Sequence, residues 1–281
     1  MDHAQDKGFV LKETYTMDEL LELMDFLRSD RGCPWDRIQT HESIQGNMLE
    51  EAYEAVDAIQ SGNPDQLREE LGDVLMQVVF HSSMAEEAGR FTFEEVVSGI
   101  CRKLISRHSH LFGEDQATTP AKVLETWEKN KKIEKGFKST SEAMRQVPRA
   151  MPALTRAFKL QKQAAHVGFD WPDVRGANEK ILEEYQELLQ EIEKAEQARI
   201  HQEAGDLLFA VVNSLRLLGV DPEAALTACS ERFVRRFSAM EAMAEERGAE
   251  LKDMSLQAMD DLWNEAKRNE GGKEEGNGDE T

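Results

Sequence analysis

Hydrophobic positions along this chain recur with the period of an α-helix. Leu20, Leu23, Met24 and Leu27 follow the i, i+3, i+4, i+7 rule, which places their side chains on one helix face. No stretch shows the alternation that a half-buried strand requires. Applied to the rest of the chain, this pattern predicts an all-α fold, with the later helices at 42–60, 65–87, 92–105, 121–132, 177–194, 198–218, 222–246 and 255–268.

The predicted helices fall into two halves of similar design. The turn signal Ser61-Gly62-Asn63-Pro64 separates two long helices in the first half, and a pair of similar length follows in the second. A stretch rich in Ser, Thr, Pro and charge lies between the halves. We therefore expect two tandem helical-bundle domains at 16–135 and 153–268, a linker at 136–152 and a disordered tail at 269–281.

The composition is strongly acidic, with 55 Asp and Glu against 34 Lys and Arg. This balance argues against a nucleic-acid-binding protein, which needs a basic face for the phosphate backbone. The three cysteines lie far apart and form no CxxC pair, as in reduced proteins of the cytoplasm. No signal peptide and no apolar run of about 20 residues is present. We expect a cytoplasmic protein with no membrane partner.

Two helix-like stretches carry the same arrangement of acids. The first reads LEEAYE followed by REELGDVL, and the second reads LEEYQE followed by HQEAGDLL. The EExxE spacing, the ExxD spacing and the interval between them all recur. Residues three or four apart share a helix face, so each stretch supplies same-face acids. The repeated acids are Glu51, Glu54, Glu70 and Asp73 in the first half, and Glu184, Glu187, Glu203 and Asp206 in the second.

These acids have the character of a site for a hard cation. A single EExxE is usually a solvated helix surface, but its repetition with ExxD favours a functional site. If the two helices of each half pack antiparallel, the acids face one another, and a cation removes their repulsion. The motif contains no histidine, unlike di-iron bundles, and an all-oxygen set suits Mg²⁺ or Mn²⁺. Because Mg²⁺ usually shares its ligands with phosphates, we expect a phosphate-bearing substrate.

Gly72 and Gly205 precede the two aspartates. A glycine inside a helix costs about 1 kcal/mol, so we expect a reason such as close packing at both positions.

Basic and aromatic residues recur downstream of the acids. Each half has two cations one helical turn apart, and then a tryptophan four residues before a lysine. Such cations can grip a triphosphate, and an indole ring can stack on a base. The residues are Lys103, Arg107, Trp127 and Lys131 in the first half, and Arg232, Arg236, Trp263 and Lys267 in the second.

Together these motifs, with GCPWDRIQTHESI and KLISRHSHLF, closely resemble tandem-domain MazG proteins. These are nucleoside triphosphate pyrophosphohydrolases of the all-α NTP pyrophosphatase superfamily, and the resemblance covers residues 16–268. It implies homodimers that hydrolyse an NTP to NMP and pyrophosphate with Mg²⁺, or Mn²⁺ as a substitute, and with broad base tolerance. By the family pattern, the eight repeated acids would hold metal, and the eight basic and tryptophan residues would contact the nucleotide.

Three further glutamates are candidates for activating the attacking water. Glu50 and Glu183 exceed what one ion needs and can act as general bases in an in-line attack on the α-phosphorus. Glu69 precedes Glu70, whereas Gln202 precedes Glu203, so the second site is the weaker one if that extra acid matters. Because the family often uses its C-terminal domain for catalysis, both sites remain candidates.

Three alternatives are compatible with parts of the pattern. The chain could bind nucleotides as a regulatory protein without turnover, or hydrolyse one particular dNTP in the manner of a dUTPase. A di-iron oxidase is disfavoured because the motif lacks histidine ligands.

Overall fold

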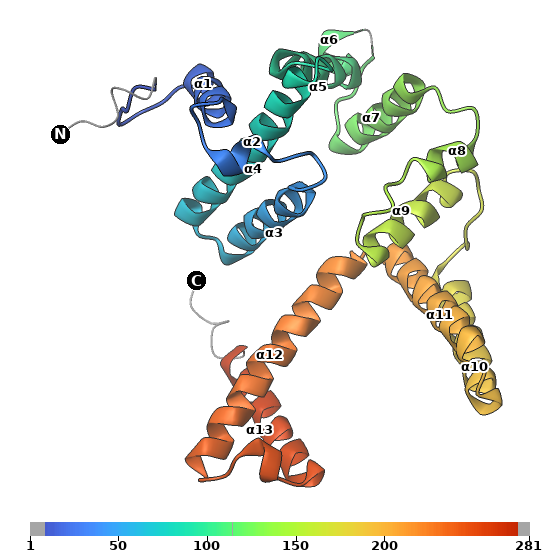
Figure 1. The fold of residues 1–281 in the computed structure, drawn as a ribbon. Helices are drawn as coiled ribbons and strands as arrows, with labels where there is room; N and C mark the ends of the chain where they lie inside the picture. The colour runs from blue at the N-terminus through green and yellow to red at the C-terminus, as the bar shows by residue number, and fades with distance from the viewer. Residues whose placement is uncertain (1–8, 114, 275–281) are drawn as a thin grey trace. The chain divides into compact units, whose positions relative to one another are not determined.

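A computed structural model gives the fold of the chain, and it describes residues 9–113 and 115–274 (Figure 1). The chain divides into two compact units, Met1–Lys135 and Gly136–Thr281. Within the described residues every regular element is helical, which confirms the predicted all-α class. None of the described helices combines the length and the apolar character that crossing a bilayer requires.

The first unit contains one long hairpin, and capping boxes begin its first and fifth helices. Thr16 accepts a hydrogen bond from the Glu19 amide, and Thr92 accepts one from the Glu95 amide. The helices of this unit are α1 (Met17–Arg28), α2 (Pro34–Arg37), α3 (Gln45–Ser61), α4 (Pro64–Glu87), α5 (Phe93–Arg107), α6 (Ser109–Phe112) and α7 (Pro120–Lys135).

The second unit repeats the long hairpin and adds a second pair of long helices. Its elements are α8 (Thr140–Arg145), α9 (Ala153–Ala165), α10 (Val174–Lys194), α11 (Gln197–Leu217), α12 (Pro222–Glu246), a 3₁₀ turn η1 (Leu251–Asp253) and α13 (Leu256–Glu274).

Each long hairpin closes through a residue in the left-handed conformation. In the first unit, Gly62 ends α3 with φ 69°, and the Asn63 side chain then caps α4. In the second unit, Ala195 occupies the corresponding turn with φ 56°. Because a side chain is strained in this region, the second turn stores strain that the first avoids. Both hairpins fix the register in which their acids meet.

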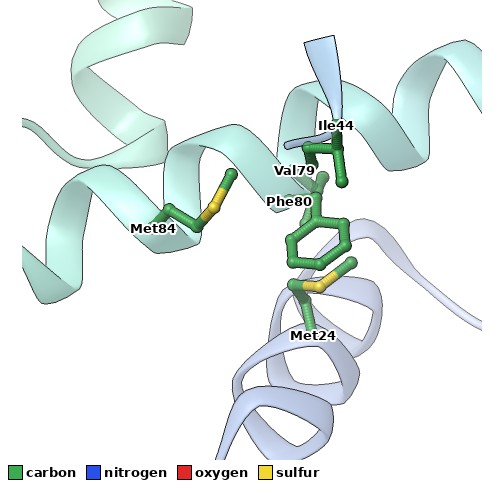
Figure 2. Close-up of a cluster of buried hydrophobic side chains, with 5 residues drawn as sticks. All are labelled: Met24, Ile44, Val79, Phe80 and Met84. Carbon is green, nitrogen blue, oxygen red and sulfur yellow. The ribbon is translucent and has the colours of Figure 1, made fainter. Parts of the chain in front are cut away.

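The core of the first unit joins α1, α4 and the residue before α3. Figure 2 shows Phe80 and Val79 of α4 packed between Met24 of α1 and Ile44, with Met84 further along α4. Val79 is fully buried and Ile44 nearly so. This cluster holds the start of α3 against α4 and thereby orients the hairpin.

The second unit has a separate core between α12 and α13. Met240 and Ala244 of α12 pack around Leu262, which is fully buried. Trp263 lies at the edge of this cluster. The packing fixes α13 against the face of α12 that carries the arginines.

Three segments differ from the sequence expectation. The 136–152 segment, expected as a linker, contains α8 and the buried Val147, so it belongs to the second unit's packing. Helix α6 forms inside the stretch expected as a loop, because the carbonyl of His108 accepts from Leu111 and Phe112. Helix α13 continues to Glu274, past the expected tail start at 269, and the rest of the tail lies outside the described residues.

Candidate active site

The first acidic cluster spans the α3–α4 hairpin. Glu51 of α3 and both Glu70 and Asp73 of α4 each place a carboxylate oxygen within 4.8 Å of the others. All three side chains are half-buried. Gln77 of α4 donates a hydrogen bond to Glu51 at 3.5 Å.

Burial and neighbouring negative charges raise the pKa values of two acids in the first cluster. Burial, together with the charge of Asp73, raises the pKa of Glu51. Burial, together with the charges of Glu54 and Glu69, raises the pKa of Glu70. These carboxylates lie close enough to repel one another, which is the arrangement expected of a metal-binding set.

The second acidic cluster occupies the corresponding place on the α10–α11 hairpin. Glu184 and Glu187 of α10 and Glu203 of α11 bring their oxygens within 4.8 Å of one another. Glu184 is 6% exposed and Glu203 is 9% exposed, so two acids of this cluster are more deeply buried than those of the first, whereas Glu187 is not buried. Burial and the charges of Glu187 and Asp206 raise the pKa of Glu203.

A lysine distinguishes the second cluster from the first. Lys180 places its ammonium 2.7 Å from Glu184 and 2.8 Å from Glu183. Hydrogen bonds to these two carboxylates raise the pKa of Lys180. Sequence reasoning missed this residue, although a lysine four residues before a glutamate on a helix is a recognised pairing signal. Asn47 stands at the equivalent place in the first half.

Each cluster lacks one acid of its predicted set of four. Glu54 and Asp206 are exposed and do not belong to the groups whose oxygens converge. They still act at a distance, since Glu54 contributes to the raised pKa of Glu70 and Asp206 to that of Glu203. The missing member differs between the units, because the α3–α4 cluster omits the last glutamate of EExxE and the α10–α11 cluster omits the aspartate of ExxD.

The three proposed base residues lie at the margins of the clusters. Glu50 and Glu69 are exposed on α3 and α4. Glu183 is exposed as well and is held by Lys180. Their roles as general bases stay predictions.

The basic and aromatic residues of the first unit gather between α5 and α7. Arg107 donates through Nε and Nη2 to Glu134, at 2.9 Å and 3.2 Å. Its guanidinium also lies over the Trp127 ring, 5.4 Å from the centroid, and His108 meets the same ring edge-on. Lys103 is exposed on α5, and Lys131 lies 3.8 Å from Glu128.

The second unit repeats this arrangement between α12 and α13. Arg236 donates through Nε to Glu270 at 2.7 Å and lies over the Trp263 ring, 5.9 Å from its centroid. Arg235 reaches the same carboxylate at 3.6 Å. Arg232 and Lys267 are exposed nearby on the same two helices. Sequence reasoning found the arginines and tryptophans of both units but missed Glu134 and Glu270.

The structure does not merge the acids and the arginines into one site within a unit. In the described part of the chain, no hydrogen bond, ion pair or ring contact joins the α3–α4 acids to Arg107 and Trp127. The same holds for the α10–α11 acids and Arg236 in the second unit. Figure 1 shows the α10–α11 hairpin and the α12–α13 pair as separate helix pairs. Each unit therefore holds its acids on one helix pair and its arginine and tryptophan on another, and we refer to these two groups as candidate half-sites.

The two helix glycines do not serve close packing within the chain. A Cβ added to Gly72 or Gly205 would meet no atom within 4 Å. The expectation of close packing is therefore wrong for this chain. Both glycines are exposed, and each directly precedes a motif aspartate.

Comparison with known proteins decides the family. The model of the MazG nucleotide pyrophosphohydrolase domain matches residues 39–112 and 176–240, one segment in each half. A nucleoside triphosphate pyrophosphohydrolase/pyrophosphatase MazG from Thermotoga maritima is 44% identical over 251 residues, covering 89% of this chain and 95% of that protein. The chain belongs to the MazG family.

Two further relatives support the same assignment. A nucleoside triphosphate pyrophosphohydrolase of Escherichia coli K12 is 43% identical over 257 residues, covering 90% of this chain and 98% of that protein. The Bacillus subtilis protein YabN, described as uncharacterized, is 47% identical over 245 residues, which cover half of its length. The matched segments contain both acidic clusters, so the repeat seen in the sequence is a pair of MazG domain regions.

Proposed function

We propose that this chain hydrolyses nucleoside triphosphates between the α- and β-phosphates, releasing NMP and pyrophosphate in the presence of Mg²⁺. The observation that carries the proposal is the duplicated carboxylate cluster, Glu51 with Glu70 and Asp73, and Glu184 with Glu187 and Glu203. The names of the relatives, nucleoside triphosphate pyrophosphohydrolases in Thermotoga maritima and Escherichia coli, support the same reaction class.

The residues of each cluster fit a magnesium ion. All the donors are carboxylate oxygens, which Mg²⁺ prefers, and burial together with neighbouring acids raises the pKa of Glu51, Glu70 and Glu203. When bound there, Mg²⁺ supplies neutralisation of phosphate charge and activation of water. Mn²⁺ has similar oxygen preferences and is the expected substitute.

The remaining roles fall to side chains of the chain itself. Arg107 and Arg236 carry permanent charges and forked donors that suit phosphate oxygens. Trp127 and Trp263 present ring faces on which a base can stack without regard to its identity, which fits broad base tolerance. Glu50, Glu69 or Glu183 takes the proton of the attacking water while water oxygen bonds to the α-phosphorus and pyrophosphate departs.

We propose that two copies of the chain form a homodimer and that each copy completes the half-sites of the other. Large apolar side chains are exposed on the hairpins that carry the acids, including Leu182 at 63% and Leu208 at 58%. Leu49 and Leu71 are exposed in the same way on α3 and α4, at 50% and 54%. Apolar faces of this kind mark association surfaces. A second copy on them would cover the hairpins and bring an Arg–Trp group to the acids.

The proposal allows catalysis in either domain or in both, and it is consistent with a location in the cytoplasm. Lys180 balances the second cluster, while the first has Asn47 in its place, so the two sites differ in charge. Glu69 of the first domain has no acidic equivalent in the second domain, where Gln202 occupies the corresponding position. A cytoplasmic location agrees with nucleoside triphosphates as substrates, and no nucleic acid or membrane partner is needed.

Product analysis tests the proposed reaction. The protein is incubated with each of the eight common NTPs and dNTPs in Mg²⁺ or in EDTA, and the products are separated by anion-exchange chromatography. We expect NMP and pyrophosphate in Mg²⁺ from several bases and no turnover in EDTA. Nucleotide binding without NMP would instead support the regulatory alternative, and turnover of a single dNTP would support a dUTPase-like enzyme.

A further inference from the structure

In each unit one arginine contacts both a tryptophan ring and a glutamate carboxylate. In the first unit, Arg107 lies between the Trp127 ring and the Glu134 carboxylate. In the second unit, Arg236 lies between the Trp263 ring and the Glu270 carboxylate. The glutamate is in both cases seven residues after the tryptophan, in WEKNKKIE and WNEAKRNE. The contact is thus duplicated in both sequence and geometry.

In each unit the glutamate pairs most closely with the arginine that the motif assigns to phosphate, although Glu270 also lies 3.6 Å from Arg235. Glu134 binds Arg107 through two hydrogen bonds, and its side chain is 27% exposed while that of Arg107 is 15% exposed. In the second unit the corresponding exposures are 31% for Glu270 and 22% for Arg236. Arg107 donates two hydrogen bonds to its glutamate and Arg236 donates one, and each guanidinium is partly buried, so both have fewer orientations than an arginine on an open helix surface.

The negative charge of the glutamate cannot attract a triphosphate, so the glutamate must have another role. A carboxylate beside an anion-binding arginine repels the anion, so its presence in both units needs a different reason. The hydrogen bond from Arg107 lowers the pKa of Glu134, and the bond from Arg236 lowers that of Glu270. Both carboxylates therefore stay ionised at neutral pH and hold their arginines throughout the range in which an enzyme of this class works.

We infer that Glu134 and Glu270 are positioning residues, which hold Arg107 and Arg236 over the tryptophan rings in the orientation that receives the triphosphate. The bond to Nε fixes one edge of the guanidinium, which leaves its remaining N–H groups for phosphate oxygens. Preorganised donors cost no reordering when the substrate binds. This inference rests on the proposed function, because it assigns the triphosphate as the arginines' ligand.

Positioning and simple charge repulsion predict opposite results for the same substitution. The variants are Glu134→Gln and Glu270→Gln in the full chain, made singly and together. The probe is an ATP analogue with a methylene group between the α- and β-phosphorus, and its binding is measured by calorimetry in Mg²⁺. If the glutamates position the arginines, the double variant binds the analogue about tenfold more weakly. If they only repel the anion, removal of their charge tightens binding.

Two control variants separate this effect from a general loss of structure. Glu265→Gln breaks a different bridge of α13, the 2.7 Å bond to Arg247, which no motif assigns to the nucleotide. Glu125→Gln removes an exposed acid of α7. We expect both to bind the analogue as the wild type does. Glu134→Asp with Glu270→Asp keeps the charge, and we expect it to recover part of the lost affinity.

The outcomes distinguish this inference from the proposed function. Weaker binding in the glutamine double variant, with normal binding in both controls, supports the positioning role. Unchanged or tighter binding in that variant overturns the inference and leaves the pyrophosphohydrolase proposal intact. A wild type that binds no analogue overturns both. Tryptophan fluorescence adds a structural readout, since release of the arginines from the rings changes emission only in the Glu134 and Glu270 variants.

Discussion

The Lys180 ammonium lies 2.7 Å from the Glu184 carboxylate, and it supplies the second acidic cluster with a cation from the chain itself. The first cluster has Asn47 at the equivalent position and no such charge. The acidic clusters of the two MazG domain regions therefore differ in charge, because among the described residues only the second has a lysine beside it. In the first, burial and neighbouring acids raise the pKa of Glu51 and Glu70, so metal and protons compete there.

This difference predicts a pH-dependent effect of Glu70→Gln. A carboxyl group whose folded-state pKa is raised binds its proton more tightly folded than unfolded, so stability falls as pH rises above the ordinary glutamate range. In EDTA we expect the melting temperature of Glu70→Gln to exceed that of the wild type at pH 8 and to equal it near pH 4. With Mg²⁺ the order at pH 8 reverses, because the variant has lost a ligand. Differential scanning calorimetry at both pH values measures this, and an equal difference at pH 4 and pH 8 would contradict the assignment.

Replacing the internal cation should destabilise the protein only without metal. Lys180→Gln leaves Glu184, whose side chain is 8% exposed, without its charged partner. An unpartnered buried group costs about 1 kcal/mol or more, which corresponds to a loss of about 2 to 4 °C in melting temperature in EDTA. We expect saturating Mg²⁺ to recover most of this loss. Asn47→Gln serves as the matched control, and an undiminished loss in Mg²⁺ would argue that no ion binds beside Glu184.

The helices and the pairing of acids could be predicted because their signals are local. Thr92 caps α5 as its place before an apolar-periodic segment predicts, and the turn at Gly62 sets the α3–α4 hairpin. Acids three residues apart share a face, so the meeting of Glu70 and Asp73 follows from spacing alone. The short turn then brings them to Glu51, which made most of each cluster foreseeable.

The rest depends on side-chain reach and tertiary contacts that spacing does not encode. Glu54 and Asp206 fit the motif, yet their side chains lie outside the converging groups. Glu134 and Glu270 gain their partners across a helix pair, so no interval within one helix marked them. Val147 is buried against the second unit although its segment has the composition of a connector. The glycines before the aspartates have no packing reason within the chain.

The strained turn of the second hairpin predicts a stabilising substitution. Ala195 has φ 56°, a conformation that glycine adopts freely and that Gly62 provides in the first hairpin. We expect Ala195→Gly to raise the melting temperature by about 2 °C, since relief of the strained backbone exceeds the added chain entropy. The control is Ala198→Gly, inside α11, where glycine should lower the melting temperature. A lower melting temperature for Ala195→Gly would contradict the strain.

The dimer proposal predicts that a charge on the exposed hairpin face dissociates the protein. Leu182 is 63% exposed on α10, so Leu182→Glu removes an apolar contact without disturbing the unit's own core. We expect light scattering after gel filtration to show a dimer for the wild type and a monomer for this variant, with unchanged helix content by circular dichroism and at least about tenfold lower activity. Gln190→Glu adds the same charge at an exposed polar position of α10 and should stay dimeric. A monomeric wild type with full activity would refute the shared site.

The most direct test of the central claim is pyrophosphate release from NTPs by Glu70→Gln, Glu203→Gln and the double variant. Each substitution keeps the side chain's size and removes one acid from one converging cluster. We predict that the double variant loses at least about 100-fold in Mg²⁺-dependent activity while it stays folded, and that the single variants show which domain carries the turnover. Wild-type pyrophosphate release by the double variant would contradict the account, because the reaction would then not depend on the carboxylate clusters.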